Sequence, residues 1–321
     1  MNFKILYTAC IKVLHILYCG FRFITQLCFL SKARYLPAFF LFTLSGIIIS
    51  SCTKDITINL PHQESQLVVE GHIEKGMPPF VVLTKSSDYY STIYLDSLSS
   101  YFVHGSVVKV SDGLDTIILD EIFLDTAGTL ISLYTSFAML GEEGKTYSLS
   151  VEAEGEILNS STTIPLALPL DSIWWEPAFI NDADTFVNLV CQYTDPPLPG
   201  QYVRYFTKEN SQPYYPGYNS VFEDNLINGT TFNFTLDRGV SRNDTASFYE
   251  GYFKFRRGDT ITVKWCAIDQ PHFDFWRTLE FELSGQGSPF ASPVIIQGNI
   301  EGALGIWGGY NPDYKTVIVP E

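Results

Sequence analysis

Residues Lys145–Ile164 read KTYSLSVEAEGEILNSSTTI, and this stretch decides the fold class. From Lys145 to Val151 apolar and polar side chains alternate, which is the period-two pattern of a strand with one buried face. Glu154-Gly155 then turns the chain into a second strand-like run, Glu156–Ile164. The sequence therefore predicts an antiparallel strand pair that closes at Ile164-Pro165, as the end of an immunoglobulin-like sandwich does.

The same alternation occurs upstream of this pair. Asp112-Gly113 lies between two of the runs and is a hairpin signal. The predicted strands are Leu67–Ile73, Phe80–Leu83, Ser106–Val110 and Thr116–Leu119. Together these runs predict an immunoglobulin-like β-sandwich over residues 66–165.

Downstream, Leu166–Leu170 (LALPL) is typical of a linker, and a second β-rich region follows it. Its predicted strands are Ser172–Glu176, Phe186–Tyr193, Tyr202–Thr207, Thr231–Leu236 and Asp259–Ile268. A short helix is predicted over His272–Leu283, because Pro271 suits a first helical turn and apolar residues follow at helical spacing. The glycine-rich end predicts positive-φ turns or close backbone approaches. The fold class is therefore all-β, with a second sandwich-like subdomain over residues 166–321.

The composition supports a folded body and restricts its partners. The chain has 321 residues, of which 46% are hydrophobic and 15% aromatic, so it can bury a sizeable core. Residues 1–52 contain five Lys or Arg and no acidic residue, so the other 15 basic and 35 acidic residues give the remainder a formal charge of −20. Such a body repels phosphate backbones, which argues against nucleic-acid binding.

The N-terminal residues 1–52 have the layout of a secretory leader. The apolar run Leu36–Ile49 follows Lys32 and Arg34 and is short for a membrane span. Directly behind it, Ile49-Ser50-Ser51-Cys52 resembles the lipobox of bacterial lipoproteins, in which the Cys thiol is acylated and becomes the new N-terminus. This resemblance predicts cleavage before Cys52, a tether over residues 53–65 and a membrane anchor made of acyl chains.

Two alternatives at the N-terminus stay open. The apolar run could be a membrane helix with an incidental Cys52, although it is short for that role. Residues 1–30 are unusual in a leader, so either translation starts later or an additional membrane-associated segment precedes the signal.

Several segments of the mature chain resemble one bacterial family. They are Leu67–Gly71, Met77–Thr84, Gly105–Gly113, Ser288–Pro293 and Asn299–Tyr310. They look like the Bacteroidota lipoproteins grouped as domain of unknown function DUF4249, and the resemblance covers roughly the whole mature chain. It implies an outer-membrane lipoprotein with no agreed activity. Because the family's genes often lie beside TonB-dependent receptors, it also implies an accessory partner of an outer-membrane nutrient importer. The alternative is an adhesin-like or carbohydrate-binding surface module that works without a transporter.

Tyrosines mark a candidate binding segment. Tyr214, Tyr215 and Tyr218 surround Pro216 and Gly217 in a predicted loop, and tyrosine offers a broad amphipathic surface for a glycan or peptide ligand. Packing within the fold is the alternative.

Asp-Ser and Asp-Thr triplets resemble the O-glycosylation motif of Bacteroidota, and average composition would give only about one or two of them. Turn chemistry is the alternative explanation for these triplets. Their hydroxyl residues are Ser97, Thr116, Thr126, Ser172, Thr245 and Thr260.

No motif predicts catalysis, a metal or a cofactor. The nucleophile elbow, the HExxH helix and the EF-hand loop do not occur in the sequence. Asp269, His272 and Asp274 lie close together, and at a helix start such residues cap the helix more often than they catalyse. Cys191 and Cys266 fit either a disulfide or two buried free thiols. We therefore expect a binding protein and not an enzyme.

Overall fold

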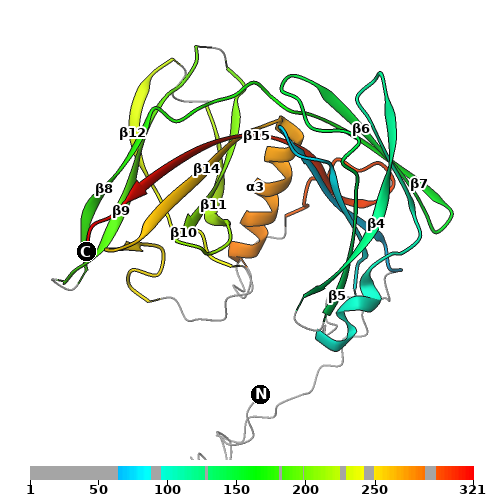
Figure 1. Cartoon of the computed structure of the whole chain (residues 1–321), viewed down its shortest axis with the longest axis horizontal. Coiled ribbons are helices and arrows are strands. Elements are labelled where there is room, and N and C mark those ends of the chain that lie inside the picture. The colour runs from blue at the N-terminus through cyan, green and yellow to red at the C-terminus, as the bar shows by residue number, and fades with distance from the viewer. Residues whose placement is uncertain are drawn as a thin grey trace, which may run out of the picture. The chain divides into compact units, whose positions relative to one another are not determined.

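The computed structural model describes residues 64–87, 95–126, 129–180, 183–197, 199–224, 229–241, 249–285 and 294–321. Over these residues the chain is mainly β, with one α-helix near the C-terminal end (Figure 1). The predicted all-β class is thus confirmed. The finer, immunoglobulin-like classification stays a prediction. Cys52 and its lipobox lie outside the described residues.

The first half of the described chain folds into two sheet layers that share one strand. The strands are β1 (Leu67–Glu74), β2 (Phe80–Lys85), β3 (Val107–Ser111), β4 (Thr116–Thr126), β5 (Thr129–Thr135), β6 (Thr146–Ala153) and β7 (Glu156–Thr163). The first part of β4 pairs with β3 and the second part with β5, so β4 crosses from one layer to the other. The predicted hairpin is the pair β6–β7. Its two turn residues, Glu154 and Gly155, have φ values of 52° and 87°, as a two-residue turn between twisted strands requires.

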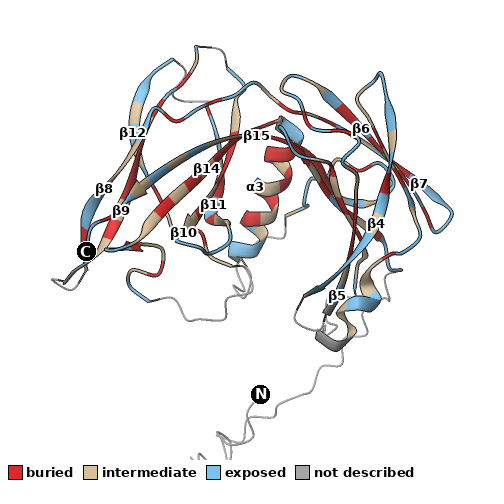
Figure 2. Cartoon of the chain, viewed as in Figure 1, coloured by how far each residue is buried: buried red, intermediate tan, exposed pale blue. Residues whose placement is uncertain are grey.

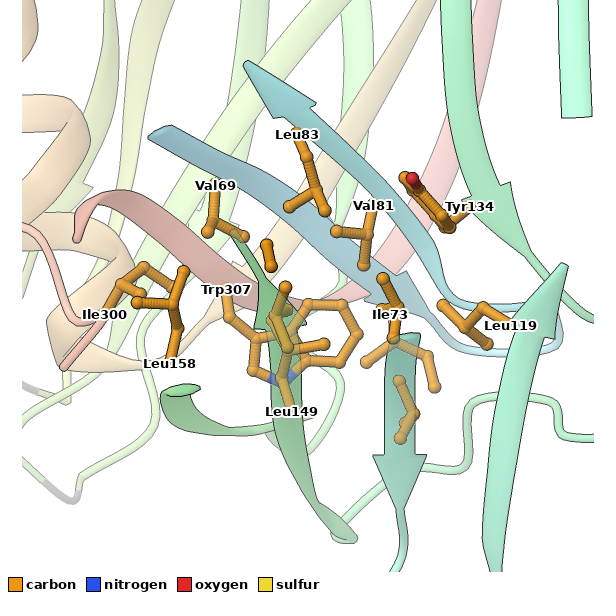
Figure 3. Close-up of a cluster of buried hydrophobic side chains, with 14 of the residues drawn as sticks. Val69, Ile73, Val81, Leu83, Leu119, Tyr134, Leu149, Leu158, Ile300 and Trp307 are labelled. Atoms are coloured by element: carbon orange, nitrogen blue, oxygen red, sulfur yellow. The ribbon is translucent and has the colours of Figure 1, made fainter. Parts of the chain in front are cut away.

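The core between these layers includes a side chain from the far end of the sequence. Trp307 is fully buried among residues of the first half, such as Val69, Ile73 and Leu149 (Figure 3). Gly71 is its register partner on β1, and a Cβ there would lie 2.9 Å from Cε3 of the Trp307 ring. Glycine at position 71 therefore makes room for the indole.

The long strand β15 (Leu304–Ile318) joins the two halves, and Figure 1 shows it as the red arrow that runs through both. Its first part pairs in parallel with β1, and its second part pairs antiparallel with β14 (Thr260–Ile268). The glycine-rich segment was expected to form turns or close approaches. Close approach is confirmed, because a Cβ at Gly308 would lie 2.3 Å from the His272 ring, but the long strand was not expected.

The second half is also built from two layers. One contains β8 (Ser172–Ile180), β9 (Ala183–Thr194), β12 (Thr231–Leu236) and β13 (Phe255–Arg256). The other contains β10 (Tyr202–Glu209), β11 (Tyr215–Glu223), β14 and the second part of β15. A second apolar core lies between the layers, and Leu168 and Leu170 of the predicted linker are buried in it.

Helix α3 (Gln270–Gly285) covers the other face of the β10–β14–β15 layer, and its buried residues include His272, Phe273 and Phe275 (Figure 2). Asp269 caps the helix, because its Oδ1 accepts the backbone N–H of His272 at 3.2 Å. This bears out the capping interpretation for Asp269. The predicted helix is confirmed and is two residues longer at each end.

Candidate functional site

A pocket opens at one end of the second sandwich, between its two sheet layers. The end is defined by four strands, because β9 and β11 finish there and β10 and β12 begin there. The pocket has a volume of about 170 Å³. Its lining comprises Tyr193, Asp195, Gln201, Val203, Phe222, Glu223, Asp224, Phe232, Phe234 and Trp265.

The apolar wall of the pocket is a set of aromatic rings around Trp265. The Trp265 ring centroid lies 5.7 Å from that of Phe234, 5.9 Å from that of Tyr193 and 6.1 Å from that of Phe222. Phe232 packs against Phe234 at 5.4 Å. These rings come from both layers, since Tyr193, Phe232 and Phe234 belong to one sheet and Phe222 and Trp265 to the other. The strand alternation that builds the second core thus continues into the pocket wall.

Two carboxylates occupy the polar end of the pocket. Asp195 follows β9 and is only 2% exposed, and Asp224 follows β11 and is 5% exposed. One oxygen of each is fixed by a glycine amide, because Gly229 N–H donates to Asp195 Oδ2 and Gly200 N–H donates to Asp224 Oδ1, both at 3.1 Å. Both glycines have φ near +75° to +90°, where a side chain would be strained.

Four further polar atoms of the pocket lining have no partner, whereas the carboxylate of Glu223, which also lines the pocket, accepts from Arg277. Within the described part of the chain, Asp195 Oδ1, Asp224 Oδ2, Gln201 Oε1 and Trp265 Nε1 are buried and accept or donate no hydrogen bond. No described basic side chain forms an ion pair with either aspartate. Buried polar atoms in native proteins are nearly always satisfied by protein, ligand or ordered water, so these four atoms are available to hydrogen-bond a ligand or water.

The electrostatics of the carboxylate pair agree with that interpretation. Burial raises the pKa of Asp195, the Gly229 N–H lowers it in part, and the nearby charge of Asp224 raises it again. Two like charges that lie close together in a buried site repel one another, which favours either a proton or an external cation there. The polar end of the pocket therefore combines negative charge with unpaired acceptor oxygens.

The comparisons with known proteins identify the family. The family profile described as Domain of unknown function (DUF4249) matches residues 53–316, which is most of the chain. The chain belongs to the DUF4249 family. The family assignment made from the sequence is thus confirmed. A search of the curated proteins found no match.

In this DUF4249 chain a second polar cluster lies under helix α3, around the buried guanidinium of Arg204. Arg204 is 3% exposed, donates to Ser220 Oγ at 3.1 Å and to the Tyr310 hydroxyl at 2.7 Å, and stacks on Trp276 with its Cζ 3.4 Å from the ring centroid. Glu280 of α3 accepts the Ser220 backbone N–H at 2.8 Å. This network holds the helix on the sheet, and its two charged groups, Arg204 and Glu280, are bonded to other residues of the network.

The predicted tyrosine loop is corrected in part. Tyr214 precedes β11, but Tyr215 and Tyr218 lie within that strand. The segment looked like a loop because of Pro216 and Gly217. Proline is tolerated on an edge strand, and the pairing of β11 with β10 shifts register beside it.

Tyr214 and Tyr218 have different ring contacts. Tyr214 contacts Lys208 and Tyr314, with the Lys208 Nζ 5.2 Å from its ring centroid. Tyr218 packs on Phe253 at 5.5 Å between ring centroids. Their binding role stays a prediction.

The candidate glycosylation residues are spread over the fold. Ser97 lies in the 3-10 helix η1 (Leu95–Tyr101), Thr116 and Ser172 are exposed at strand starts, and Thr260 is half-buried at the start of β14. Thr126 ends β4, and nothing is described of its side chain, while Thr245 lies outside the described residues. Modification of these residues stays a prediction.

For the described residues the structure also shows the state of the two cysteines and lets metal-ligand clusters and membrane-spanning helices be searched for. Cys191 and Cys266 are free and buried, which decides between the two alternatives given above. No described cluster of three or more His, Cys, Asp or Glu side chains could hold a metal ion. In the same ranges, no helix has the length and apolar character needed to cross a membrane.

The pocket was missed at the sequence level. Its aromatic residues follow ordinary strand alternation, as in Thr231–Leu236 (TFNFTL), and this pattern predicts a core as readily as a pocket wall. The signal that could have revealed it is Tyr193-Thr194-Asp195, where a carboxylate follows a buried strand on the same face as an aromatic ring. Asp224 occupies the equivalent place after Phe222 on β11.

Proposed function

We propose that the mature DUF4249 chain is a ligand-binding lipoprotein of the cell envelope, anchored in the outer membrane through acylated Cys52. In this proposal it is a non-enzymatic accessory of a TonB-dependent importer and presents or retains a small ligand for it. The observation that carries the binding role is the aromatic pocket with four unpaired buried polar atoms. Apolar pockets with a few convergent polar groups are the usual form of small-ligand sites.

Two features support the lipid anchor. Ile49-Ser50-Ser51-Cys52 directly follows an apolar run of signal-peptide length, and the family match begins at residue 53, immediately after Cys52. The charge of −20 on the remainder of the chain disfavours attachment through a basic surface. Acyl chains would provide the attachment that charge does not.

The carboxylate pair also contains the residue types of a glycoside hydrolase, and the size of the pocket argues against that activity. In such enzymes two carboxyl groups flank a bond between two sugar units. The pocket volume of about 170 Å³ is close to that of a cavity that holds one benzene molecule. It accommodates one small group, so binding fits this space better than hydrolysis of a chain.

One observation favours the alternative function, a glycan-binding module without a transporter. A groove of about 630 Å³ lies on the outer face of the β3–β6–β7 layer. Its lining is mostly hydroxyl and amide groups, including Ser148, Ser150, Asn159 and Ser160. These groups can hydrogen-bond sugar hydroxyls. However, the groove has no aromatic residue for a sugar ring to stack on, so we place this function second.

The decisive experiment compares the full-length chain with its Cys52→Ala variant in a diderm host that carries the native gene neighbourhood. We expect the wild-type protein to incorporate a fatty-acid label at Cys52, to fractionate with outer membranes and to bring down a large β-barrel protein from detergent extracts. The variant is expected to lose the label and the membrane fraction.

Cys191→Ser is the matched control, since it removes a buried thiol and should keep the label. Unmodified Cys52 in the mature wild-type protein would contradict the anchor. Absence of any co-purified barrel, with binding to a glycan array, would favour the alternative.

A further inference from the structure

We propose that the pocket at the end of the second sandwich binds a primary ammonium group carried on a short apolar stem. This inference deepens the proposed binding function and rests on it. It assigns the ligand class: a small organic amine, or the terminal amine of a lysine side chain in a peptide.

The first argument is charge. Asp195 and Asp224 line the same pocket, both are more than nine-tenths buried, and each has one oxygen without a partner. Burying carboxylates costs free energy unless a cation or several hydrogen-bond donors compensate for the lost water. Gly229 and Gly200 provide one N–H to each carboxylate, and within the described residues no cation is added. A positively charged ligand would supply the compensating charge that these described residues do not provide.

The second argument is the number of acceptors. The unpaired oxygens are Asp195 Oδ1, Gln201 Oε1 and Asp224 Oδ2. A primary ammonium group has three N–H donors and no acceptor, so its donors match three acceptor oxygens. A quaternary ammonium group has no N–H donor and would leave all three oxygens unsatisfied. The indole N–H of Trp265 adds one donor, which a hydroxyl or carbonyl group of the ligand would satisfy.

The third argument is the apolar wall. Tyr193, Phe222, Phe232, Phe234 and Trp265 surround the same cavity. Aromatic faces attract a cation, and they also bury the hydrocarbon part of a ligand. A volume of about 170 Å³ suits a stem about the size of one six-membered ring, because a cavity of about 150 Å³ holds benzene. Aromatic rings beside carboxylates therefore select a stem that is apolar and a head that is charged.

A calcium ion is the competing occupant of three unpaired oxygens. Calcium takes six to eight oxygen ligands, and water or backbone carbonyls would have to complete its shell. The rest of the lining is mostly rings, which offer no oxygen except the Tyr193 hydroxyl, and the carboxylate of Glu223 pairs with Arg277. Among the described residues no cluster of three or more His, Cys, Asp and Glu side chains could hold a metal ion. The wall thus favours an organic cation over a metal ion, and calcium becomes one outcome of the test.

The test uses the purified full chain in detergent and isothermal titration calorimetry. The probes are phenethylamine, its neutral analogue 2-phenylethanol, its trimethylated analogue, Nα-acetyl-lysine amide and calcium chloride. We expect phenethylamine or acetyl-lysine amide to bind. The neutral and trimethylated compounds should bind more weakly by a factor of about ten or more, because the charged hydrogen bonds are lost. The tighter of the two amines identifies the source as a free amine or a peptide side chain.

Variants then locate the binding. Asp195→Asn and Asp224→Asn keep the shape of each side chain and are expected to weaken amine binding about tenfold each. Asp171→Asn is the matched control, because Asp171 is exposed, lies outside the pocket and carries the same charge. It should change amine affinity less than about twofold, since an exposed charge is screened. Circular dichroism checks that each variant is folded.

Three results would overturn the inference. They are equal binding of the amine and the neutral analogue, amine binding that both asparagine variants retain, and binding of calcium without binding of any amine. These results leave the anchor and the importer partnership untouched, because those are read from fatty-acid labelling and barrel co-purification. Conversely, if the purified chain binds the amine but Cys52 of the mature wild-type protein proves unmodified, the ligand assignment stands and the proposed membrane anchor is contradicted.

Discussion

Trp307 donates its indole N–H to the backbone carbonyl of Tyr147 at 2.9 Å, across 160 positions of sequence. The indole is fully buried between the two layers of the first sandwich, although it belongs to the last strand of the chain. The side chain of Asn299 also holds the backbone of Trp307. Its Oδ1 accepts the Trp307 backbone N–H at 2.9 Å, and its amide group donates to the Trp307 backbone carbonyl at 2.8 Å. The first half is therefore incomplete without the C-terminal segment.

Replacement of Trp307 by Phe tests this dependence. The variant loses one buried hydrogen bond and part of the ring volume, so we expect the free energy of unfolding to fall by about 2 kcal/mol. Urea denaturation followed by circular dichroism measures the change. Trp174→Phe is the control, since the Trp174 indole bonds Glu176 at the surface, and it should cost about 0.5 kcal/mol or less. Equal losses in the two variants would contradict the structural role of Trp307.

A second prediction concerns Gly308 and His272, which meet where β15 passes under α3. A Cβ at position 308 would lie 2.3 Å from the His272 ring, which is itself buried. We expect Gly308→Ala to cost about 2 kcal/mol, because the ring and helix must shift. In the double variant Gly308→Ala/His272→Ala the clash is absent. The two changes should then be non-additive by about 1 kcal/mol or more in denaturant unfolding, whereas simple additivity would show that the two sites are independent.

How far the sequence predicted the fold depends on how local each signal was. β6, β7 and α3 were predicted because the signals of each are local. The strand pair shows alternation around a turn dipeptide, the helix shows a proline in its first turn, and each pattern fits within about twenty residues. β15 was not found, because Gly305, Gly308 and Gly309 resemble loop residues. Each of them is required by a neighbour that is distant in sequence, such as Val69 behind Gly305. The sequence around each glycine therefore does not show that glycine is required there.

The candidate site shows the same limit. The aromatic residues of the pocket were visible as strand residues, but nothing local shows that Phe222 on one sheet and Phe234 on the other line the same pocket. Asp195 and Asp224 are 29 positions apart, and only the meeting of two strand ends brings them to one pocket. For the tyrosines a local signal was present, but it indicated the wrong structure. Pro216 and Gly217 suggested a loop, and the structure places Tyr215 and Tyr218 on an edge strand.

The two cysteines of the folded body give a third prediction. Burial raises the pKa of both Cys191 and Cys266 to about 12, and neither is accessible to solvent. The thiolate is the reactive form, so neither residue should react with a thiol reagent such as Ellman's reagent in the native protein. Both should react after unfolding in urea without reductant. Two thiols that appear only after reduction would mean that a disulfide joins them.

The fourth prediction concerns the pH dependence of stability and rests on His72. Its ring stacks on Phe80 with centroids 5.6 Å apart and lies edge-on to Tyr310 at 5.7 Å. Burial lowers the pKa of His72 to about 4, and the charges of Lys264 and Arg204 also lower it, while Glu74 opposes them. In the unfolded chain its pKa is about 6.5. Between these two values the unfolded state binds a proton that the folded state does not.

The folded state should therefore lose stability as the pH falls from about 6.5 toward 4, because protons favour the state that binds more of them. His272, whose pKa burial lowers well below its usual value, contributes in the same direction. We expect His72→Gln to reduce the slope of unfolding free energy against pH in this window, by at most about 1.4 kcal/mol per pH unit. Urea unfolding of both proteins at pH 7, 6, 5 and 4.5 measures the slopes. The absolute stability of the variant is not the readout, so a packing loss at neutral pH does not obscure the result. Parallel curves would show that His72 takes up its proton equally well in the folded and unfolded chain.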